Sequence, residues 1–388
     1  MRLSIVMGLS LALLAGACGC KKQGGSSSSS GDILIGEYAS LTGDTATFGV
    51  SSHNGLMLAI EQINSAGGVL GRKIALRTED DGSKANQAVT AAKKLISQDG
   101  VVAVIGEVAS KCSLAVAPTC QKQQVPMLSP ASTNPDVTVE NGKVKPWIFR
   151  ICFTDDFQGR AGAQWARDNG WKRVAVLTDE DQDYSKGLAR VFEESYGGHG
   201  QIVSNDSYRG SDTEFRSQLT RIARQHPDAV YLPGYYTQVG MIVRQAREVG
   251  LKVPFFGGDG WDSDLTLAEP AAQGDYYSDH FTAEDPSPRV QAFVKAYRAK
   301  YGSTPDAMAV LGYDAGGVIA QAIRDAGKVD RAAIRDALAK ITNYPGASGS
   351  ITIDKNHNAR KPIVILQIKD HKAVLAKTYT NEELMSGK

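Results

Sequence analysis

Short apolar runs alternate with amphipathic stretches along almost the whole chain, and this alternation limits the possible folds more than any other feature. A β-branched run that stops at a glycine, such as residues 101–105 before Gly106, is typical of a buried strand. Strands that alternate with helices form a parallel sheet covered on both faces, so we expect an α/β fold. In the first half the predicted strands are residues 33–38, 73–78, 101–105, 125–128 and 147–153, with helices at 51–65, 86–98 and up to 121.

The alternation begins afresh after residue 152, and this predicts a second lobe of the same kind. The chain of 388 residues also exceeds the ~250–300 residues at which a single core stops growing. Three late helices, at 288–301, 307–326 and 330–339, have no strands between them, so we expect them to complete the first lobe. The prediction is two doubly wound parallel-sheet lobes joined by a three-segment hinge, with lobe 1 at 32–152 and 282–354 and lobe 2 at 153–281 and 355–388.

The first residues have the pattern of an export signal. Arg2 precedes an apolar run at residues 3–17, which small residues and a cysteine follow. Residues 14–18 (LAGAC) resemble a bacterial lipobox, so we expect a signal peptide at 1–18 and a lipid on Cys18. Cys20 is a second candidate, and an ordinary secretory signal is the alternative. Residues 19–31, which include five consecutive serines, then form a flexible tether outside the cytoplasm.

Charge and motif content exclude several functions. The 43 Lys and Arg residues balance 42 Asp and Glu residues, and no basic stretch predicts a nucleic-acid partner. No phosphate-binding glycine motif, zinc-protease motif or serine-hydrolase motif is present, so we predict neither an enzyme nor a cofactor. The six histidines are scattered and predict no metal. The carboxylate groups at 80–81 and 179–181 fit solvated loops or helix caps, with acid–base work or a cation as the alternative.

Hydroxyl, aromatic and acidic side chains gather where predicted strands end. In an open α/β sheet this edge is where ligands bind. On lobe 1 the hydroxyls and backbone donors fit a carboxylate, although by themselves they fit helix caps equally well. On lobe 2 an acid between aromatic rings fits a cation with an apolar body, so the two sets together fit an α-amino acid. The candidates are Ser110, Ala131 and Thr133 on lobe 1 and Tyr184, Tyr235 and Asp259 on lobe 2.

Several motifs in order resemble a known family. They are LTG at 41–43, NSAGG at 64–68, SPASTNP at 129–135, GYY at 234–236 and RQAREVGL at 244–251. The chain from about residue 33 to 369 resembles the type 1 periplasmic binding proteins for leucine, isoleucine and valine. These proteins are the substrate-binding subunits of branched-chain amino-acid ABC transporters.

The resemblance implies a role for each candidate residue. Ser110 and Thr133 look like the hydroxyl donors to the ligand carboxylate, with backbone groups from Ala131. Asp259 stands where the family places an acid for the α-ammonium, although here it is Asp rather than Glu, and Tyr235 resembles a further contact to that end. The remaining matches are Phe48 and Tyr184, at aromatic positions near the ligand side chain, and Ala109, where related proteins vary.

The cysteines depart from the family pattern. An oxidising compartment permits a disulfide among Cys112, Cys120 and Cys152, and spacing alone does not choose the pair. Leucine-binding relatives pair two cysteines at the positions that Gly82 and Ala109 occupy here, so that bond is absent. In its place we expect Cys120–Cys152, since both flank the strand at 125–128.

We therefore expect a monomeric extracytoplasmic lipoprotein that captures an amino acid between hinged lobes and delivers it to an ABC transporter permease. Leucine, isoleucine and valine are the expected ligands. One alternative is an amino-acid or amide sensor without a transport role. Another is the same transport role for a different small amide or carboxylate. A hydrolase or dehydrogenase of similar topology is disfavoured, because no nucleophile–base or phosphate signature was found.

Overall fold

The computed structural model describes residues 31–386. The predicted signal peptide, the lipidation candidates Cys18 and Cys20, and all of the tether except Gly31 lie outside the described residues. None of the helices in the described part of the chain is long and apolar enough to cross a membrane.

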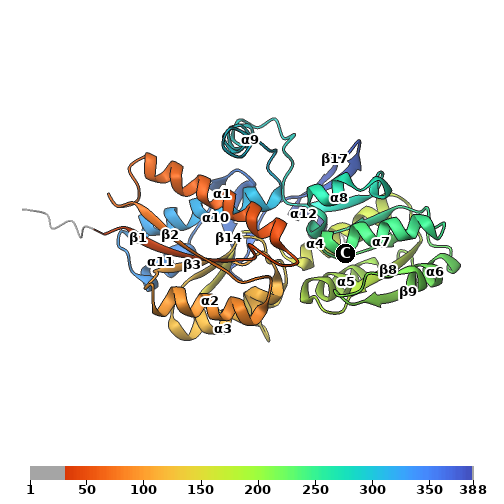
Figure 1. Cartoon of the computed structure of the whole chain (residues 1–388), viewed down its shortest axis with the longest axis horizontal. Helices are drawn as coiled ribbons and strands as arrows, with labels where there is room; N and C mark the ends of the chain where they lie inside the picture. Colours follow the sequence, from red (N-terminus) through yellow and green to blue (C-terminus); the bar gives the residue numbers. More distant parts are fainter. Residues whose placement is uncertain (1–30, 387–388) are drawn as a thin grey trace, which may run out of the picture. The chain divides into compact units, whose positions relative to one another are not determined.

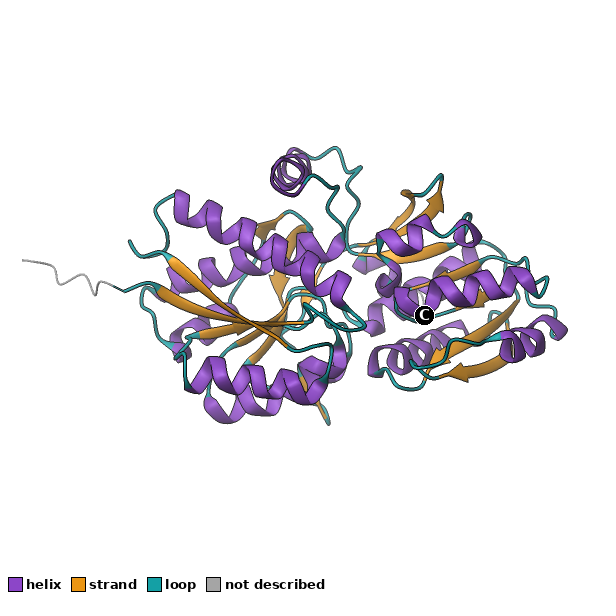
Figure 2. Cartoon of the chain, in the orientation of Figure 1, coloured by secondary structure: helices purple, strands orange, loops and turns teal. Residues whose placement is uncertain are grey.

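The first sheet consists of five parallel strands in the order β2-β1-β3-β4-β7 (Figure 1). Helices cover both of its faces, as Figure 2 shows. We call this sheet and its helices lobe 1. Its strands are β1 (Ile33–Ala39), β2 (Ile74–Asp80), β3 (Ala103–Ile105), β4 (Met127–Ser129) and β7 (Ile148–Arg150), and its first helices are α1 (Ala46–Ser65), α2 (Ala85–Ser97) and α3 (Ser110–Gln123).

Strand alternation divides the core of lobe 1 between the two faces of its sheet. Met127 and Ile148 pack with α2 and α3, whereas the next residues along, Leu128 and Phe149, pack on the opposite face with α1. Successive side chains of a strand point to opposite faces, so each three-residue strand serves both cores. Because each parallel strand is followed by a loop and a helix, helix N-termini and loops gather at the carboxyl edge of the sheet, where the candidate residues lie.

The second sheet has seven strands in the order β17-β16-β12-β11-β10-β8-β9, and we call it and its helices lobe 2. Its strands β8 to β12 are parallel, as predicted for a doubly wound lobe, and β16 and β17 form an antiparallel hairpin beside β12. The strands are β8 (Arg173–Asp179), β9 (Gln201–Tyr208), β10 (Ala229–Tyr231), β11 (Phe255–Gly257), β12 (Tyr276–Asp279), β16 (Ile363–Lys369) and β17 (Lys372–Tyr379). The helices are α4 (Asp155–Asp168), α5 (Asp183–Tyr196), α6 (Arg216–Arg224), α7 (Tyr236–Glu248), α8 (Asp264–Ala268) and α12 (Asn381–Ser386).

The chain passes between the two sheets three times, after β7, after β12 and after the small strand β15. Between the second and third passages, α10 packs along α1 and α11 packs against α10, as predicted for helices that complete lobe 1. Residues 351–353 belong to a separate three-stranded antiparallel sheet instead of a main sheet. These elements are α9 (Pro288–Tyr301), α10 (Ala307–Ala326), α11 (Arg331–Leu338), β13 (Tyr344–Gly346), β14 (Gly349–Ile353) and β15 (Ala359–Arg360). The exact lobe limits stay a prediction.

The predicted Cys120–Cys152 disulfide is wrong. Cys112, Cys120 and Cys152 are all free thiols, and all are buried. Cys120 belongs to the core between the first sheet and α2 and α3, whereas Cys152 belongs to the core on the opposite face of that sheet. The sheet therefore separates the two sulfur atoms, although the two residues flank the same strand in the sequence.

Candidate ligand-binding site

A small cavity lies where residues from the carboxyl ends of both sheets meet, with a volume of about 10 Å³. Six of the eight residues predicted for the site line it, although they are scattered over more than two hundred positions of the sequence. The wall consists of Phe48, Val108, Ala131, Thr133 and Met308 from lobe 1 and Tyr184, Tyr235, Asp259 and Gly260 from lobe 2.

Aromatic rings form the apolar part of this wall. Tyr184, near the start of α5, and Tyr235, just before α7, are stacked with ring centroids 5.0 Å apart and planes 5° apart. Phe48 of α1 meets the edge of Tyr235 from the other lobe at 6.0 Å. Burial raises the pKa values of both tyrosines well above their usual range, so both phenols remain hydroxyl donors.

Asp259 follows β11 and is held by three side chains. Its Oδ1 accepts hydrogen bonds from Gln158 Nε2 at 2.8 Å and from Tyr184 Oη at 2.9 Å. Its Oδ2 lies 3.0 Å from His280 Nε2. Burial lowers the pKa of His280 to about 4, against the opposing effect of Asp259, so the ring is neutral at pH 7 and donates Nε2–H. Asp259 is thus fixed in orientation and keeps little of its accepting capacity for a ligand.

Asp155 is a second buried acid, which the sequence interpretation missed, and its N–H donates to the backbone oxygen of the cavity residue Thr133 at 2.9 Å. The residue begins α4 and is completely buried, and neither carboxyl oxygen has a hydrogen-bond partner within the described residues. Burial, the field of Asp259 and that of Asp156 raise its pKa well above the usual range, against the opposing effects of Thr133 and Arg150. Its place directly after the predicted strand at 147–153 was the available sequence signal.

The lobe 1 side of the cavity offers backbone donors. Ala131 and Thr133 are buried in the loop after β4, and their N–H groups donate to no acceptor within residues 31–386. The loop is anchored to the end of β4, because Ser132 N donates to Ser129 Oγ at 2.9 Å. Buried backbone donors are almost always paired in native proteins, so two unpaired ones on residues that line a cavity indicate an acceptor supplied from outside.

Two predicted residues do not line the cavity. Ser110 is the first residue of α3, and its Oγ accepts the N–H of Asn134 at 3.3 Å, which joins the α3 start to the loop after β4. Ala109 has its N–H occupied, since that group donates to Glu107 Oε2 at 2.7 Å. The structure thus connects both residues to the site through its supporting loops. The wall residues that the sequence interpretation missed are Val108, Met308 and Gly260.

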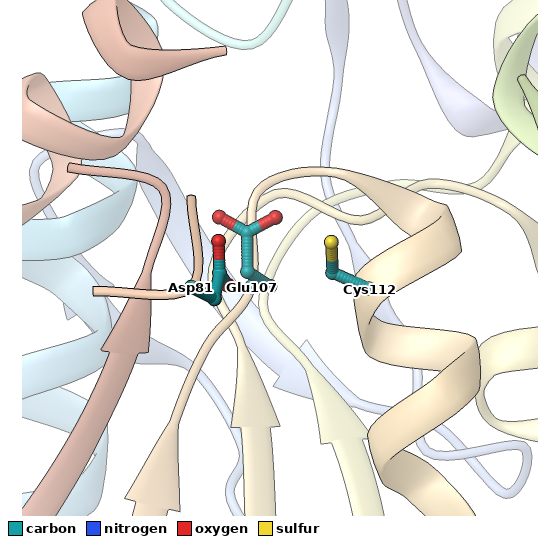
Figure 3. A group of neighbouring side chains, drawn as sticks. All are labelled: Asp81, Glu107 and Cys112. Carbon is teal, nitrogen blue, oxygen red and sulfur yellow. The ribbon is translucent and has the colours of Figure 1, made fainter. Parts of the chain in front are cut away.

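Asp81, Glu107 and Cys112 form a group that has the residue types of a metal site. One ligand atom each from Asp81, Glu107 and Cys112 lies within 4.8 Å of the others, and all three residues are buried (Figure 3). No other such group of three occurs in the described part of the chain. The sequence prediction of no metal stays a prediction.

Comparisons with known proteins agree with this geometry. The sequence profile of the family described as periplasmic binding protein matches residues 32–373. The Leu/Ile/Val-binding protein BraC3 of Rhizobium johnstonii is 33% identical over 327 residues, which cover 83% of this chain and 87% of that protein. The leucine-binding protein LivK of Thermotoga maritima superposes with a TM-score of 0.86 at 37% identity, over 90% of this chain and 99% of that one.

A second similar structure contains a ligand. It is the branched-chain amino acid transporter substrate-binding protein LivJ of Streptococcus pneumoniae in complex with isoleucine, with a TM-score of 0.84 and 32% identity over 89% of this chain and 100% of that one. The chain has the type 1 periplasmic binding protein fold, and it belongs to the periplasmic binding protein family. The family consists of solute-binding proteins.

Proposed function

We propose that this protein is the substrate-binding component of a branched-chain amino-acid ABC transporter and captures leucine, isoleucine or valine between its lobes. The observation that carries the proposal is the polarity of the cavity. Asp259 lines the cavity with the lobe 2 aromatic residues, the buried acid Asp155 donates its N–H to Thr133 O, and unpaired N–H groups of Ala131 and Thr133 lie on lobe 1. An α-amino acid supplies an ammonium for the acids and a carboxylate for the N–H groups.

Each contact follows from the needs of a buried charge. Thr133 and Ala131 receive the carboxylate, because backbone donors aimed at an anion gain from a dry surrounding. Asp155 receives the ammonium, because a buried carboxylate without a partner is strongly disfavoured and a cation removes that penalty. Asp259 orients Tyr184, whose ring with Tyr235, Phe48 and Met308 contacts an aliphatic side chain. Ser110 supports the carboxylate loop through Asn134.

The alternative ligands fit the cavity less well. A simple carboxylic acid satisfies the N–H groups but leaves Asp155 without a cation, and a neutral amide leaves the same deficit. A sensor role uses the same binding step, and a cognate permease distinguishes transport from sensing. The wall residues are six aromatic or aliphatic side chains, one threonine, one aspartate and one glycine, which offer no nucleophile–base pair for catalysis.

The proposal includes the location and the organisation of the chain. We infer that the protein is a monomeric extracytoplasmic lipoprotein held by a lipid on Cys18, with the lobe limits predicted above. Ligand binding then shifts the population toward a closed form that the permease recognises. Several contacts in the structure join the two lobes, among them Asn134 Nδ2 to Asp183 O at 2.9 Å and Thr47 N to Tyr236 Oη at 3.2 Å. They support such a closed form.

A calorimetric and thermal-shift screen tests the proposal. We expect leucine, isoleucine or valine to bind and to raise the melting temperature, because a ligand of the folded state stabilises it by mass action. The decarboxylated amine and the deaminated acid of each ligand serve as matched controls, since each keeps the side chain and removes one charged end. Both should bind at least about a hundredfold more weakly. Equal binding of the deaminated acids would disprove the amino-acid assignment.

A further inference from the structure

Glu107 connects three loops at the carboxyl edge of the first sheet. Its side chain accepts Ser40 N–H at Oε1 (3.0 Å), after β1, and Ala109 N–H at Oε2 (2.7 Å), before α3. Its backbone oxygen accepts the hydroxyls of Ser129 at 2.9 Å and Ser132 at 2.7 Å, in the loop after β4. One residue thus fixes the two loops that present Val108, Ala131 and Thr133 to the cavity.

Asp81, directly after β2, lies against this side chain. Its Oδ1 accepts Ser40 Oγ–H at 3.1 Å and Ser83 N–H at 2.9 Å. Its Oδ2 has no partner within the described residues, although Asp81 is completely buried. Figure 3 shows the Asp81 and Glu107 carboxyl groups side by side, with Cys112 beyond them.

The geometry needs a proton between the two acids. Two adjacent carboxylates that form no ion pair with a cation cannot both be ionised at low energetic cost in a buried position. A proton held by Glu107 satisfies Asp81 Oδ2, while both Glu107 oxygens continue to accept backbone N–H groups, since a protonated carboxyl keeps accepting capacity. Burial accordingly raises the pKa of Glu107 to about 8 and that of Asp81 to about 6.

We propose that Glu107 is a positioning residue for the ligand-carboxylate loops and acts as an acid that shares one proton with Asp81, so that loss of this proton at alkaline pH weakens ligand binding. The inference rests on the proposed amino-acid function and concerns the regulation of that site. On ionisation the pair carries two negative charges, which repel each other and the ligand carboxylate held by the neighbouring loop.

The surroundings of the pair contain one cation. Lys111 of α3 opposes the negative charge at Asp81 and Cys112, and burial raises the pKa of the Cys112 thiol far above its usual range, so Cys112 stays neutral. The titratable and charged groups that face the pair are Tyr38, Asp80, Lys111, Cys112 and, from lobe 2, Tyr235. The two tyrosines stay neutral because burial raises their pKa values, so the titration near pH 8 belongs to the pair.

Calorimetric titration of leucine at several pH values tests the inference. We expect the Kd of the unchanged protein to rise by about tenfold between about pH 7 and about pH 9, because each unit by which the ligand raises the pKa of Glu107 corresponds to a factor of ten. Asp81→Asn places an amide N–H where the shared proton lies. This variant should bind leucine at about pH 7 as tightly as the unchanged protein. Its Kd should not rise at alkaline pH, apart from the rise that deprotonation of the ligand ammonium causes.

Two further variants complete the experiment. Asp179→Asn changes a buried carboxylate at the end of β8 that also has an unpartnered Oδ2 but does not line the cavity, so it should keep the pH profile of the unchanged protein. Glu107→Gln should also lose the alkaline weakening, but with about tenfold lower affinity at all pH values, because its amide nitrogen cannot accept one of the two backbone N–H groups.

The outcomes separate the two proposals. If no amino acid binds at any pH, the proposed function fails. If leucine binds and Asp81→Asn shows the same alkaline weakening as the unchanged protein, the shared proton is disproved. A stoichiometric divalent metal in the purified protein, lost in Cys112→Ala, would also overturn the inference, because a metal ion would then hold the two acids instead of a proton.

Discussion

At the scale of single residues, Asp155 is a buried acid whose burial costs free energy in the ligand-free protein. The carboxyl is completely buried, makes no hydrogen bond within the described residues and has its pKa raised by burial. A carboxyl group with a raised pKa contributes stability below its unfolded pKa and loses that contribution as the pH rises. In the ligand-free protein Asp155 therefore destabilises the fold at pH 7, and a ligand ammonium removes the penalty.

Asp155→Asn should accordingly raise the stability of the ligand-free protein and lower its affinity for amino acids. We expect the melting temperature without ligand to rise by about 2 °C or more and leucine affinity to fall by about a hundredfold, because the ammonium loses its charged acceptor. Asp156→Asn, at the exposed neighbouring position, is the matched control and should change neither quantity. Scanning calorimetry and leucine titration measure the two effects, and unchanged affinity in Asp155→Asn would remove this residue from the site.

At the scale of elements, helix α10 illustrates how one lobe completes the other. The sequence prediction of this helix at 307–326 is confirmed to the residue. Its first N–H group, on Ala307, donates to Asp262 Oδ2 at 2.7 Å, and Asp262 follows β11 in lobe 2. A carboxylate at a helix N-terminus is stabilised by the free N–H groups and by the dipole. The contact fixes the helix beside Met308, which lines the cavity.

Asp262→Ala should weaken leucine binding without any change in the cavity wall. The lost contact joins the lobes, so its free energy of about 1–2 kcal/mol is lost only from the closed form, which corresponds to about tenfold in Kd. Asp264→Ala, at an exposed position two residues further along, should keep the affinity of the unchanged protein. Titration of both variants with leucine measures the difference. Equal affinities in the two variants would show that the Asp262 contact does not favour closure.

At the scale of the whole molecule, buried acids make stability depend on pH. Burial raises the pKa to about 6 for Asp81, Asp179 and Asp262 and to about 7 for Asp275 and Asp306. Unfolded aspartates titrate near pH ~3.9, so each of these groups contributes stability that is full below that value and is lost as the pH rises through its folded pKa.

The melting temperature of the ligand-free protein should therefore be higher at about pH 5 than at about pH 8, by about 5 °C or more. His280 and His357 act in the opposite direction, since their lowered folded pKa values cost stability as the pH falls below ~6.5, but the buried acids outnumber them. Thermal unfolding at both pH values measures the difference, and added salt should preserve it because buried groups are weakly screened. A higher melting temperature at the alkaline value would contradict this assignment.

The amount that local sequence patterns predict differs between the fold and the site. The periodicity of apolar residues gave the helices α9 and α10 with their exact limits. It did not give the small sheet at β13 to β15, because strand pairing depends on which strands meet. At the site, strand ends indicated Thr133 and Asp259 but not Met308, which comes from a helix that packs against the sheet from far along the chain.

The sequence by itself determined the α/β alternation, the three passages between the sheets and the strand ends at which polar residues gather. These features depend on local periodicity, which each segment carries alone. Only the tertiary structure decided which oxygen and nitrogen atoms lack partners, namely those of Asp155, Asp81 and the loop after β4. It also decided that Cys120 and Cys152 lie on opposite faces of a sheet. Burial and pairing arise from contacts between segments distant in the chain, so no local pattern encodes them.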